Sequence, residues 1–232
     1  MCYISKDMAG RADKGKFIVI EGNDGSGKTT QLELLKSFLT KKQTPVQIFD
    51  FPQYQTFHGE FLGRLLNGEF GDLDQINPYL VTFPYALDRL GATPYIKAAL
   101  DSGKIVLSNR YVTSNLAHQS GRLPKEKRRS FIDWNIELEY YVNGLPREDA
   151  VVFLYVPHKN ARKLLKKRQR RGLDIAENDQ EYLSGAEEGY LYLADRFDHW
   201  IKIDCVDEKG KILPKNEIHK RIVLELSSRH LI

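Results

Sequence analysis

The stretch FIVIEGNDGSGKTT, residues 17–30, determines the fold that the rest of the sequence is expected to adopt. It opens with an apolar, β-branched run of the kind that forms a buried parallel strand. The pattern G-x-x-x-x-G-K-T follows from Gly22 to Thr29, and an amphipathic segment with leucines at 32, 35 and 39 comes next. A strand, a glycine-rich turn and a helix in this order predict a P-loop, which binds phosphate groups.

The chemistry of phosphate binding explains this spacing. Glycines let backbone N–H groups curl around phosphate oxygens, and the N-terminus of the following helix adds positive charge. Lys28 is expected to reach the outer phosphates of a nucleotide, and the Thr29 hydroxyl is expected to ligate Mg²⁺. A chance match of a short pattern is the alternative, but the flanking strand and helix favour a nucleotide site. The predicted phosphate-binding set is Gly22, Asn23, Asp24, Gly25, Ser26, Gly27, Lys28, Thr29 and Thr30.

Composition indicates one globular domain. The chain has 232 residues, of which 41% are hydrophobic, and its net charge of +4 suits polyanionic small substrates as well as nucleic acid. Its two cysteines are too few for a disulfide framework or a zinc site and favour a reducing, cytoplasmic location. No apolar run reaches the ~18 residues of a membrane span. Residues 1–15 lack the apolar core of a secretory signal and are expected to be a disordered leader before a single domain at 16–232.

Strand and helix patterns alternate along the chain. Strands are predicted at 17–20, 46–51, 104–108, 150–156 and 200–204, and helices at 28–41, 57–66, 77–100, 125–141, 160–171, 181–197 and 215–228. Pro84 is expected to kink or break the third helix. The alternation predicts an α/β fold, the three-layer α/β/α sandwich of P-loop NTPases, with a five-stranded parallel sheet.

Ligands of an open parallel sheet bind at the carboxyl ends of its strands. Polar residues of the segments 23–29, 52–54 and 109–119 are therefore expected to converge on one cleft. Arg110, after the third strand, is suited to clamp a phosphate, although a surface ion pair is the ordinary alternative. Asp88 and Arg89 are neighbours on the third helix and are expected to have different partners or to be solvated.

The basic run RKLLKKRQRR at 162–171 has three interpretations. It is a solvated helix face, a nucleic-acid patch, or a cationic lid, at about 160–180, over a transferring phosphoryl group. Acidic residues follow at once and aromatic residues for base stacking are missing, so nucleic acid is not the expected partner. After the fourth strand of a P-loop protein, the lid is favoured because phosphoryl transfer depends on positioning and charge neutralisation.

With these segments in place, the chain resembles the thymidylate kinase (dTMP kinase) family from Phe17 to the last helix. The resemblance rests on ordered motifs: EGNDGSGKTTQ at 21–31, FPQY at 51–54, YALDR at 85–89, NRYVTSNLAHQ at 109–119, GLP at 144–146, and RGLD at 171–174 followed by Glu177. The P-loop alone indicates only NTP binding. The Asp-Arg and Asn-Arg-Tyr motifs in this order are specific.

The resemblance implies phosphoryl transfer from ATP–Mg²⁺ to dTMP, giving dTDP for dTTP synthesis, in a homodimer. Arg110 would clamp the acceptor phosphate, near Asp24 and Tyr54. Tyr85 would stack on the thymine, which Arg89 and Asn115 would hydrogen-bond. Gly25 stands where some members have arginine, so the chain resembles the type whose catalytic arginines lie in the lid. The implied catalytic residues are Lys28, Asp24, Arg110, Arg168, Arg170 and Arg171; the substrate set is Asp24, Phe51, Tyr54, Tyr85, Arg89, Arg110, Ser114, Asn115, His118, Gln119 and Glu177; and the metal set is Thr29 and Asn109.

Four positions depart from the family pattern: Asn109, His118, Gln53, where many members have arginine, and Ala176, where an aromatic residue is frequent. Asn109 stands where members usually have an aspartate that helps to hold Mg²⁺ through water, and we expect Glu21 or Asp24 to supply the missing charge. His118 stands where members often have a tyrosine beside the sugar 2′ position, so discrimination against ribonucleotides is open. Three alternatives remain: another (deoxy)nucleoside or nucleoside monophosphate kinase on this fold, a non-catalytic nucleotide-binding module, and a nucleic-acid-binding protein.

Overall fold

A five-stranded parallel sheet forms the centre of the computed structural model, which describes residues 14–157, 159–160 and 180–232. The strands are β1 (Phe17–Glu21), β2 (Val46–Asp50), β3 (Ile105–Asn109), β4 (Ala150–Tyr155) and β5 (Trp200–Asp204), in the spatial order β2-β3-β1-β4-β5. Both the number of strands and their parallel direction confirm the prediction. β1 lies in the middle, where the strand order reverses, so the turn after it lies at the ligand-binding crevice of such sheets.

Helices connect the strands: α1 (Lys28–Lys41), α2 (Phe57–Leu66), α3 (Pro78–Asp101), α4 (Val112–Gly121), α5 (Lys125–Ile136), α8 (Gln180–Arg196) and α9 (Lys215–Ser228). A 3₁₀ turn, η1 (Leu73–Gln75), precedes α3, and a π-helical segment, η2 (Glu137–Val142), extends α5. The sequence analysis missed α4, and the helix that it predicted at 125–141 is present as α5 continued by η2. The break expected at Pro84 does not occur, since α3 continues through Pro84 and Pro94.

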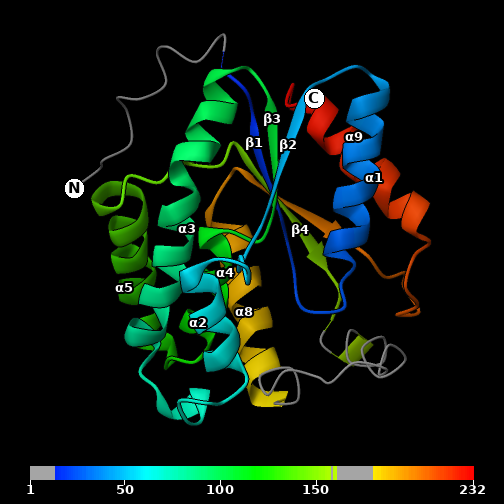
Figure 1. Cartoon of the computed structure of the whole chain (residues 1–232). Coiled ribbons are helices and arrows are strands. Elements are labelled where there is room, and N and C mark those ends of the chain that lie inside the picture. The colour runs from blue at the N-terminus through cyan, green and yellow to red at the C-terminus, as the bar shows by residue number, and fades with distance from the viewer. Residues whose placement is uncertain (1–13, 158, 161–179) are drawn as a thin grey trace.

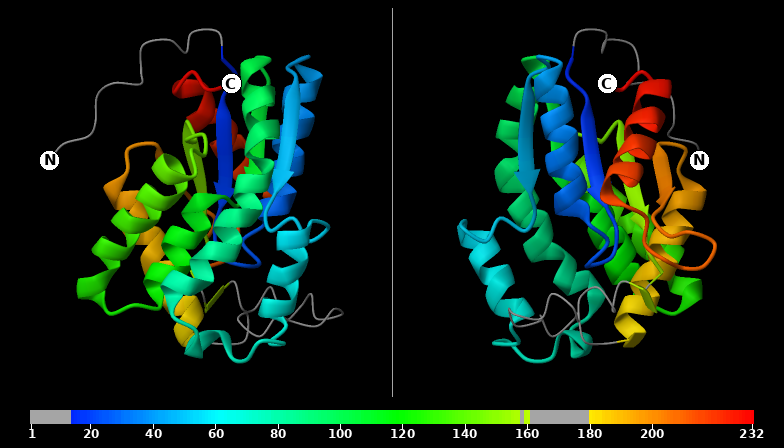
Figure 2. Two further views of the ribbon diagram at one scale, coloured as in Figure 1. Left: turned by 60° about the vertical axis from the view of Figure 1, so that its left-hand side comes forward. Right: turned by 90° about the vertical axis from the view of Figure 1, so that its right-hand side faces the viewer.

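Two apolar layers cover the two faces of the sheet. On one face, α1 and α9 contribute a leucine and isoleucine layer against the even-numbered residues of β1, Ile18 and Ile20. On the other, α3, α4, α5 and α8 pack on Phe17 and Val19, whose side chains point to the opposite side. Figures 1 and 2 show this arrangement, with the sheet between the two sets of helices. The three-layer sandwich is therefore confirmed.

Helices α4 and α8 approach each other closely through glycines. A Cβ atom on Gly121 would lie 2.3 Å from the carbonyl oxygen of Gly185, and one on Gly189 would lie 2.3 Å from that of Ala117. Neither distance leaves room for a side chain. This contact joins the helix that follows β3 to the helix that leads into β5.

Several predictions fall outside the described residues. These are the leader at 1–13, nearly all of the helix predicted at 160–171 and of the lid at about 160–180, and with the lid its catalytic or substrate residues Arg168, Arg170, Arg171 and Glu177. Residues 14 and 15 of the expected leader are placed: Gly15 donates its N–H to the Leu100 carbonyl at 2.8 Å. A search of the described residues found no helix with the length and hydropathy needed to cross a membrane.

Candidate active site

The P-loop links β1 to α1 as a glycine-rich turn in which Gly22, Gly25 and Gly27 have positive φ. Gly22 has φ +143°, and a Cβ atom there would lie 2.7 Å from the Leu154 carbonyl oxygen and 2.8 Å from Ser26 Oγ. Only glycine fits this conformation and this space. Thr29 is the second residue of α1 and is exposed, so its hydroxyl is accessible to a ligand at the helix N-terminus.

Lys28 curls back over the loop that precedes it. Its Nζ donates to the carbonyl oxygens of Gly22 at 2.8 Å and Asn23 at 3.2 Å, and lies 3.3 Å from Asp24 Oδ1. Burial and the neighbouring Arg110 lower the pKa of Lys28 to about 8, although Asp24 partly offsets them. A polyphosphate would reverse this effect because it brings negative charge to the ammonium group. The geometry thus fits the predicted role in holding phosphates.

Arg110 and Asp24 form an ion pair beside Lys28. Nη2 of Arg110 donates to Asp24 Oδ1. Burial raises the pKa of Asp24, but Arg110 and Lys28 outweigh it and hold that pKa far below its usual range. The backbone of Arg110 has φ +64°, which is unusual for a residue with a side chain and costs about 1–3 kcal/mol. This conformation directs the guanidinium toward the P-loop instead of along β3.

Glu21, at the end of β1, is a fully buried carboxylate beneath Arg110. It accepts hydrogen bonds from Thr113 Oγ1 at 2.7 Å, from Ser114 Oγ at 2.9 Å and from the Tyr190 hydroxyl at 2.8 Å. Ser114 in turn accepts from Arg110 Nη1 at 3.2 Å. Glu21 is therefore saturated by donors of α4 and α8 and serves to fix the groups around Arg110.

A cavity at the carboxyl ends of the strands, here named the strand-end cavity, gathers most of the predicted substrate set. The predicted residues that line it are Asp24, Tyr54, Tyr85, Arg89, Arg110, Ser114, Asn115, His118 and Gln119. The lining also includes four residues outside the predicted substrate set: Pro52 and Tyr111, from segments expected at the cleft, and Leu66 and Tyr182, which the sequence analysis missed. Phe51 instead packs behind the cavity, 5.9 Å from the ring of Tyr111.

The end of the cavity remote from the P-loop is built on a buried ion pair. Arg89 donates to Glu139 of η2 through Nε at 2.7 Å and Nη2 at 2.5 Å. Asn115 Nδ2 lies 3.3 Å from the same carboxylate. Asp88, the neighbour of Arg89, instead accepts the Gln53 backbone N–H at 2.9 Å. The expectation of different partners is confirmed; the solvated alternative is wrong, because Asp88 and Arg89 are each 2% exposed.

His118 lies between the two ends of the cavity. Its Nε2 is 3.2 Å from Arg110 Nη1, and its ring stacks on Tyr182 of α8 with centroids 5.6 Å apart. Burial and Arg110 lower the pKa of His118 to about 3, so the imidazole is neutral near pH 7. Since an arginine can only donate, Nε2 is the acceptor and the ring proton is on Nδ1.

Asn109 is paired with a carboxylate that the sequence analysis did not consider. In the sheet register Asp50 of β2 lies beside Asn109 of β3, and Asn109 Nδ2 donates to Asp50 Oδ1 at 2.8 Å. Asn109 Oδ1 is buried and receives no hydrogen bond from the described residues. Burial raises the pKa of Asp50, against the hydrogen bond from Asn109. Within the described chain there is no cluster of three metal-binding side chains, so a metal here would need ligands from a nucleotide.

Comparison with known proteins identifies the family. The sequence profile of the thymidylate kinase family matches residues 20–218. The chain is 31% identical to the thymidylate kinase of Prochlorococcus marinus (strain NATL1A) over 218 residues, which cover 90% of this chain and 98% of that protein. It is 31% identical to the thymidylate kinase of Plasmodium falciparum (isolate 3D7), with 92% of this chain and 90% of that protein covered.

The fold has a solved counterpart. The structure of thymidylate kinase from Candida albicans superposes with a TM-score of 0.74 at 18% identity, covering 94% of this chain and 93% of that one. At this identity the match supports the fold, and the family assignment rests on the sequence matches. Taken with the P-loop and the strand-end cavity, these matches show that the chain belongs to the thymidylate kinase family, the ATP-dependent kinases of nucleoside monophosphates.

Proposed function

We propose that the strand-end cavity is the dTMP site and that the P-loop beside it holds ATP–Mg²⁺. The enzyme transfers the γ-phosphoryl group of ATP to dTMP, giving dTDP and ADP. The observation that carries the assignment of the site is the contact of Arg110, which lines the cavity, with Asp24 of the P-loop. Two phosphate-binding elements thereby meet at one point, as the transfer of a phosphoryl group between two nucleotides requires.

The phosphate end needs little chemistry beyond positioning and charge. An acceptor phosphate oxygen is already anionic, so attack on the γ-phosphorus needs no strong general base. Lys28 and the P-loop amides would hold the donor phosphates, and Arg110 would clamp the acceptor phosphate. Asp24 pairs with both cations until the substrates arrive, offsets one of their two charges and keeps the guanidinium oriented. The lid arginines 168, 170 and 171 complete the proposed charge neutralisation in the transition state.

The other end of the cavity would receive the nucleoside. Tyr85 would stack on the thymine, Arg89 and Asn115 would bond its polar edge, and Gln119 would lie near the base or the sugar. Tyr54 is 51% exposed at the cavity, consistent with an approach to the acceptor phosphate. His118 and Tyr182 form a further wall of the cavity.

The residues at the strand ends fit a magnesium ion. Mg²⁺ prefers oxygen ligands and retains several waters, and here an exposed hydroxyl, a carboxylate and an unpartnered amide oxygen occur on Thr29, Asp50 and Asn109. The bound ion would neutralise charge on the phosphates. We infer that Asp50 supplies the charge missing at Asn109, because Glu21 is saturated by donors and Asp24 is paired with Arg110.

We also propose a homodimer in the cytoplasm. Leu80, Phe83 and Leu87 lie three to four residues apart on α3 and are 62%, 43% and 42% exposed. They present an apolar strip that a second copy of the chain would cover. Phe131 and Ile132 of α5, by contrast, are completely buried within the chain and belong to its core. Light scattering coupled to gel filtration tests the dimer.

The activity is tested by an ADP-release assay with ATP–Mg²⁺ and dTMP, dUMP, UMP, CMP, dCMP, dGMP or thymidine as the acceptor. Preference for dTMP is expected. Preference for another monophosphate would retain the assignment as a nucleoside monophosphate kinase and would change the assigned acceptor. Absence of turnover with every acceptor, with ATP still bound, would refute the proposed function in favour of a nucleotide-binding module.

A further inference from the structure

Glu139 is a buried carboxylate that touches two cavity residues without being part of the lining. It lies in η2, is 0% exposed, and binds Arg89 through both carboxylate oxygens. One of these oxygens also accepts from Asn115 Nδ2 at 3.3 Å. Arg89 and Asn115 line the strand-end cavity. Glu139 therefore stands behind the two side chains that would meet the polar edge of a base.

The neighbours of Asn115 determine which atom of its amide faces the cavity. Nδ2 donates to Glu139 and to the Thr82 backbone carbonyl, each at 3.3 Å. A carbonyl oxygen and a carboxylate paired with arginine can only accept, so the reversed amide would set oxygen against oxygen twice. The Asn115 amide is thus held with both N–H groups turned to the protein. Oδ1, an acceptor, is the atom left for a ligand.

Arg89 contributes the opposite polarity. Three of the five N–H groups of an arginine are used here, two toward Glu139 and one toward the Tyr111 carbonyl at 3.3 Å. The two remaining N–H groups can donate to a ligand. Their directions are fixed because the bidentate Glu139 carboxylate holds the plane of the guanidinium. The base end of the cavity therefore offers an arginine donor next to an amide acceptor, and Glu139 holds both in place.

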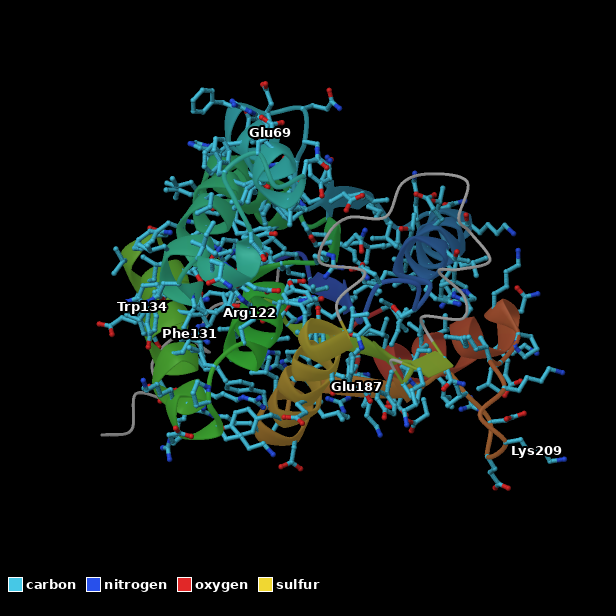
Figure 3. All side chains as sticks on the ribbon, turned by 90° about the horizontal axis from the view of Figure 1, so that it is seen from below. Glu69, Arg122, Phe131, Trp134, Glu187 and Lys209 are labelled. Carbon is cyan, nitrogen blue, oxygen red and sulfur yellow. The ribbon has the colours of Figure 1, made fainter. Side chains whose placement is uncertain are left out.

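Gln119 adds a second donor, because a neighbouring side chain fixes the orientation of its amide as Glu139 fixes that of Asn115. Its Oε1 accepts from Arg122 Nη1 at 2.7 Å, which leaves the Nε2 donor for the cavity. Arg122 is itself anchored to the carbonyl oxygens of Leu73 and Ile76, each at 2.6 Å. Figure 3, the view from below, labels Arg122 beside α4. Donors from Arg89 and Gln119 and an acceptor from Asn115 match a base edge with two carbonyl oxygens and one N–H.

We propose that Glu139 is a positioning residue that makes this cavity select bases with a carbonyl oxygen beside a ring N–H. Thymine and uracil carry two carbonyls and one N–H on this edge and match all three groups. Cytosine and adenine present an amino donor beside a ring acceptor and would leave the Arg89 donor and the Asn115 acceptor unpaired. Guanine matches these two groups but offers a further donor to Gln119. This inference rests on the proposed assignment of the cavity as the dTMP site, and it explains how that site would select the base.

The test measures kcat and KM for dTMP, dCMP and dGMP, and the dissociation constants of dTMP and dCMP by calorimetry, in the wild type, Glu139→Asp and Glu139→Gln. Glu139→Asp keeps the charge opposite Arg89 but withdraws the carboxylate from Asn115. In both variants the preference for dTMP over dCMP is expected to fall at least ~10-fold, mainly through KM, since one directed hydrogen bond is worth about that factor.

Glu148→Gln is the matched control. Glu148 is also buried, follows η2 and accepts from the Tyr140 hydroxyl at 2.7 Å, but it does not contact Arg89 or Asn115. This variant is expected to keep the wild-type preference. Thermal melting establishes which variants fold. If Glu139→Gln does not fold, the result for Glu139→Asp alone tests the proposal. An unchanged preference in folded Glu139→Asp would overturn the proposal. Absence of turnover in the wild type would refute the proposed function but not the role of Glu139. The ratio of the dissociation constants of dTMP and dCMP in the wild type and the variants would still test that role.

Discussion

The two ends of the strand-end cavity differ in the interactions that organise them. At the phosphate end, Lys28, Asp24 and Arg110 form a cluster of charges over a glycine-rich turn, and the pKa values of Lys28 and Asp24 are both lowered. At the base end, Arg89 and Glu139 are paired with almost no exposure, and hydrogen bonds fix the direction of each polar group. Charge dominates at the end where we propose that a charged group is transferred, whereas hydrogen-bond direction dominates at the end proposed to bind a neutral base.

The comparison predicts that the largest loss of rate comes from the phosphate end. Lys28→Ala should lower kcat by about 10³-fold, because the transition state loses a cation in a site shielded from water. The dissociation constant of dTMP should change by less than about tenfold, because Lys28 does not touch the base end. Lys36→Ala, on the exposed face of the same helix, is the control. A kcat within tenfold of the wild type would refute the role of Lys28.

A second test concerns the charge carried by the strand ends. Asp50→Asn should raise the Mg²⁺ concentration for half-maximal rate about 10–100-fold, as loss of an oriented carboxylate does at other metal sites. The double variant Asp50→Asn with Asn109→Asp returns one carboxylate to this pair of strands and should recover most of the loss. Electron paramagnetic resonance of Mn²⁺ bound with ATP gives an independent readout. An unaltered metal requirement in Asp50→Asn, together with a raised one in Asp24→Asn, would assign the charge to Asp24.

The smallest predicted effect concerns His118, between the two ends. Its pKa is about 3 in the folded protein and about 6.5 in an unfolded chain, so the unfolded chain binds more protons between these values. Stability conferred by neutral His118 is complete above pH 6.5 and is lost as the pH falls, by about 2 kcal/mol at pH 5. Arg110, Lys28 and Asp24 keep their charges over this range.

Urea denaturation at pH 6.5 and pH 5 measures this loss. His118→Asn should remove the histidine contribution and lose less stability over the interval than the wild type, whereas His230→Asn, outside the cavity, should behave as the wild type does. Equal losses in the wild type and His118→Asn would show that the imidazole accepts a proton in the folded protein without cost.

The residues that meet at the phosphate end could be named from the sequence because most of them lie in one local motif. Asp24, Lys28 and Thr29 belong to a turn whose spacing has a chemical reason. Arg110 was predicted from its place after a strand. By contrast, α4 was not predicted. Its segment VTSNLAHQSG buries polar and apolar residues alike, including Thr113 and Gln119, so it lacks the amphipathic period of a surface helix.

The carboxylates that support the site were missed for a related reason. Glu139 lies in the polar segment ELEYYV, where a charged residue is typically solvated, and only the tertiary fold brings it to Arg89, fifty residues away. Asp50 ends its strand without a motif of its own, and its importance depends on the register that sets it opposite Asn109. Long-range pairing of this kind leaves no periodic pattern in a single sequence.

The glycine contact between α4 and α8 has a consequence for the shape of the site. Gly121, Gly185 and Gly189 let these helices touch backbone to backbone, and alanine at any of the three would force them apart. His118 on α4 and Tyr182 on α8 would then separate, although each would be chemically intact. The absence of a side chain at three positions outside the cavity lining therefore sets the width of the cavity.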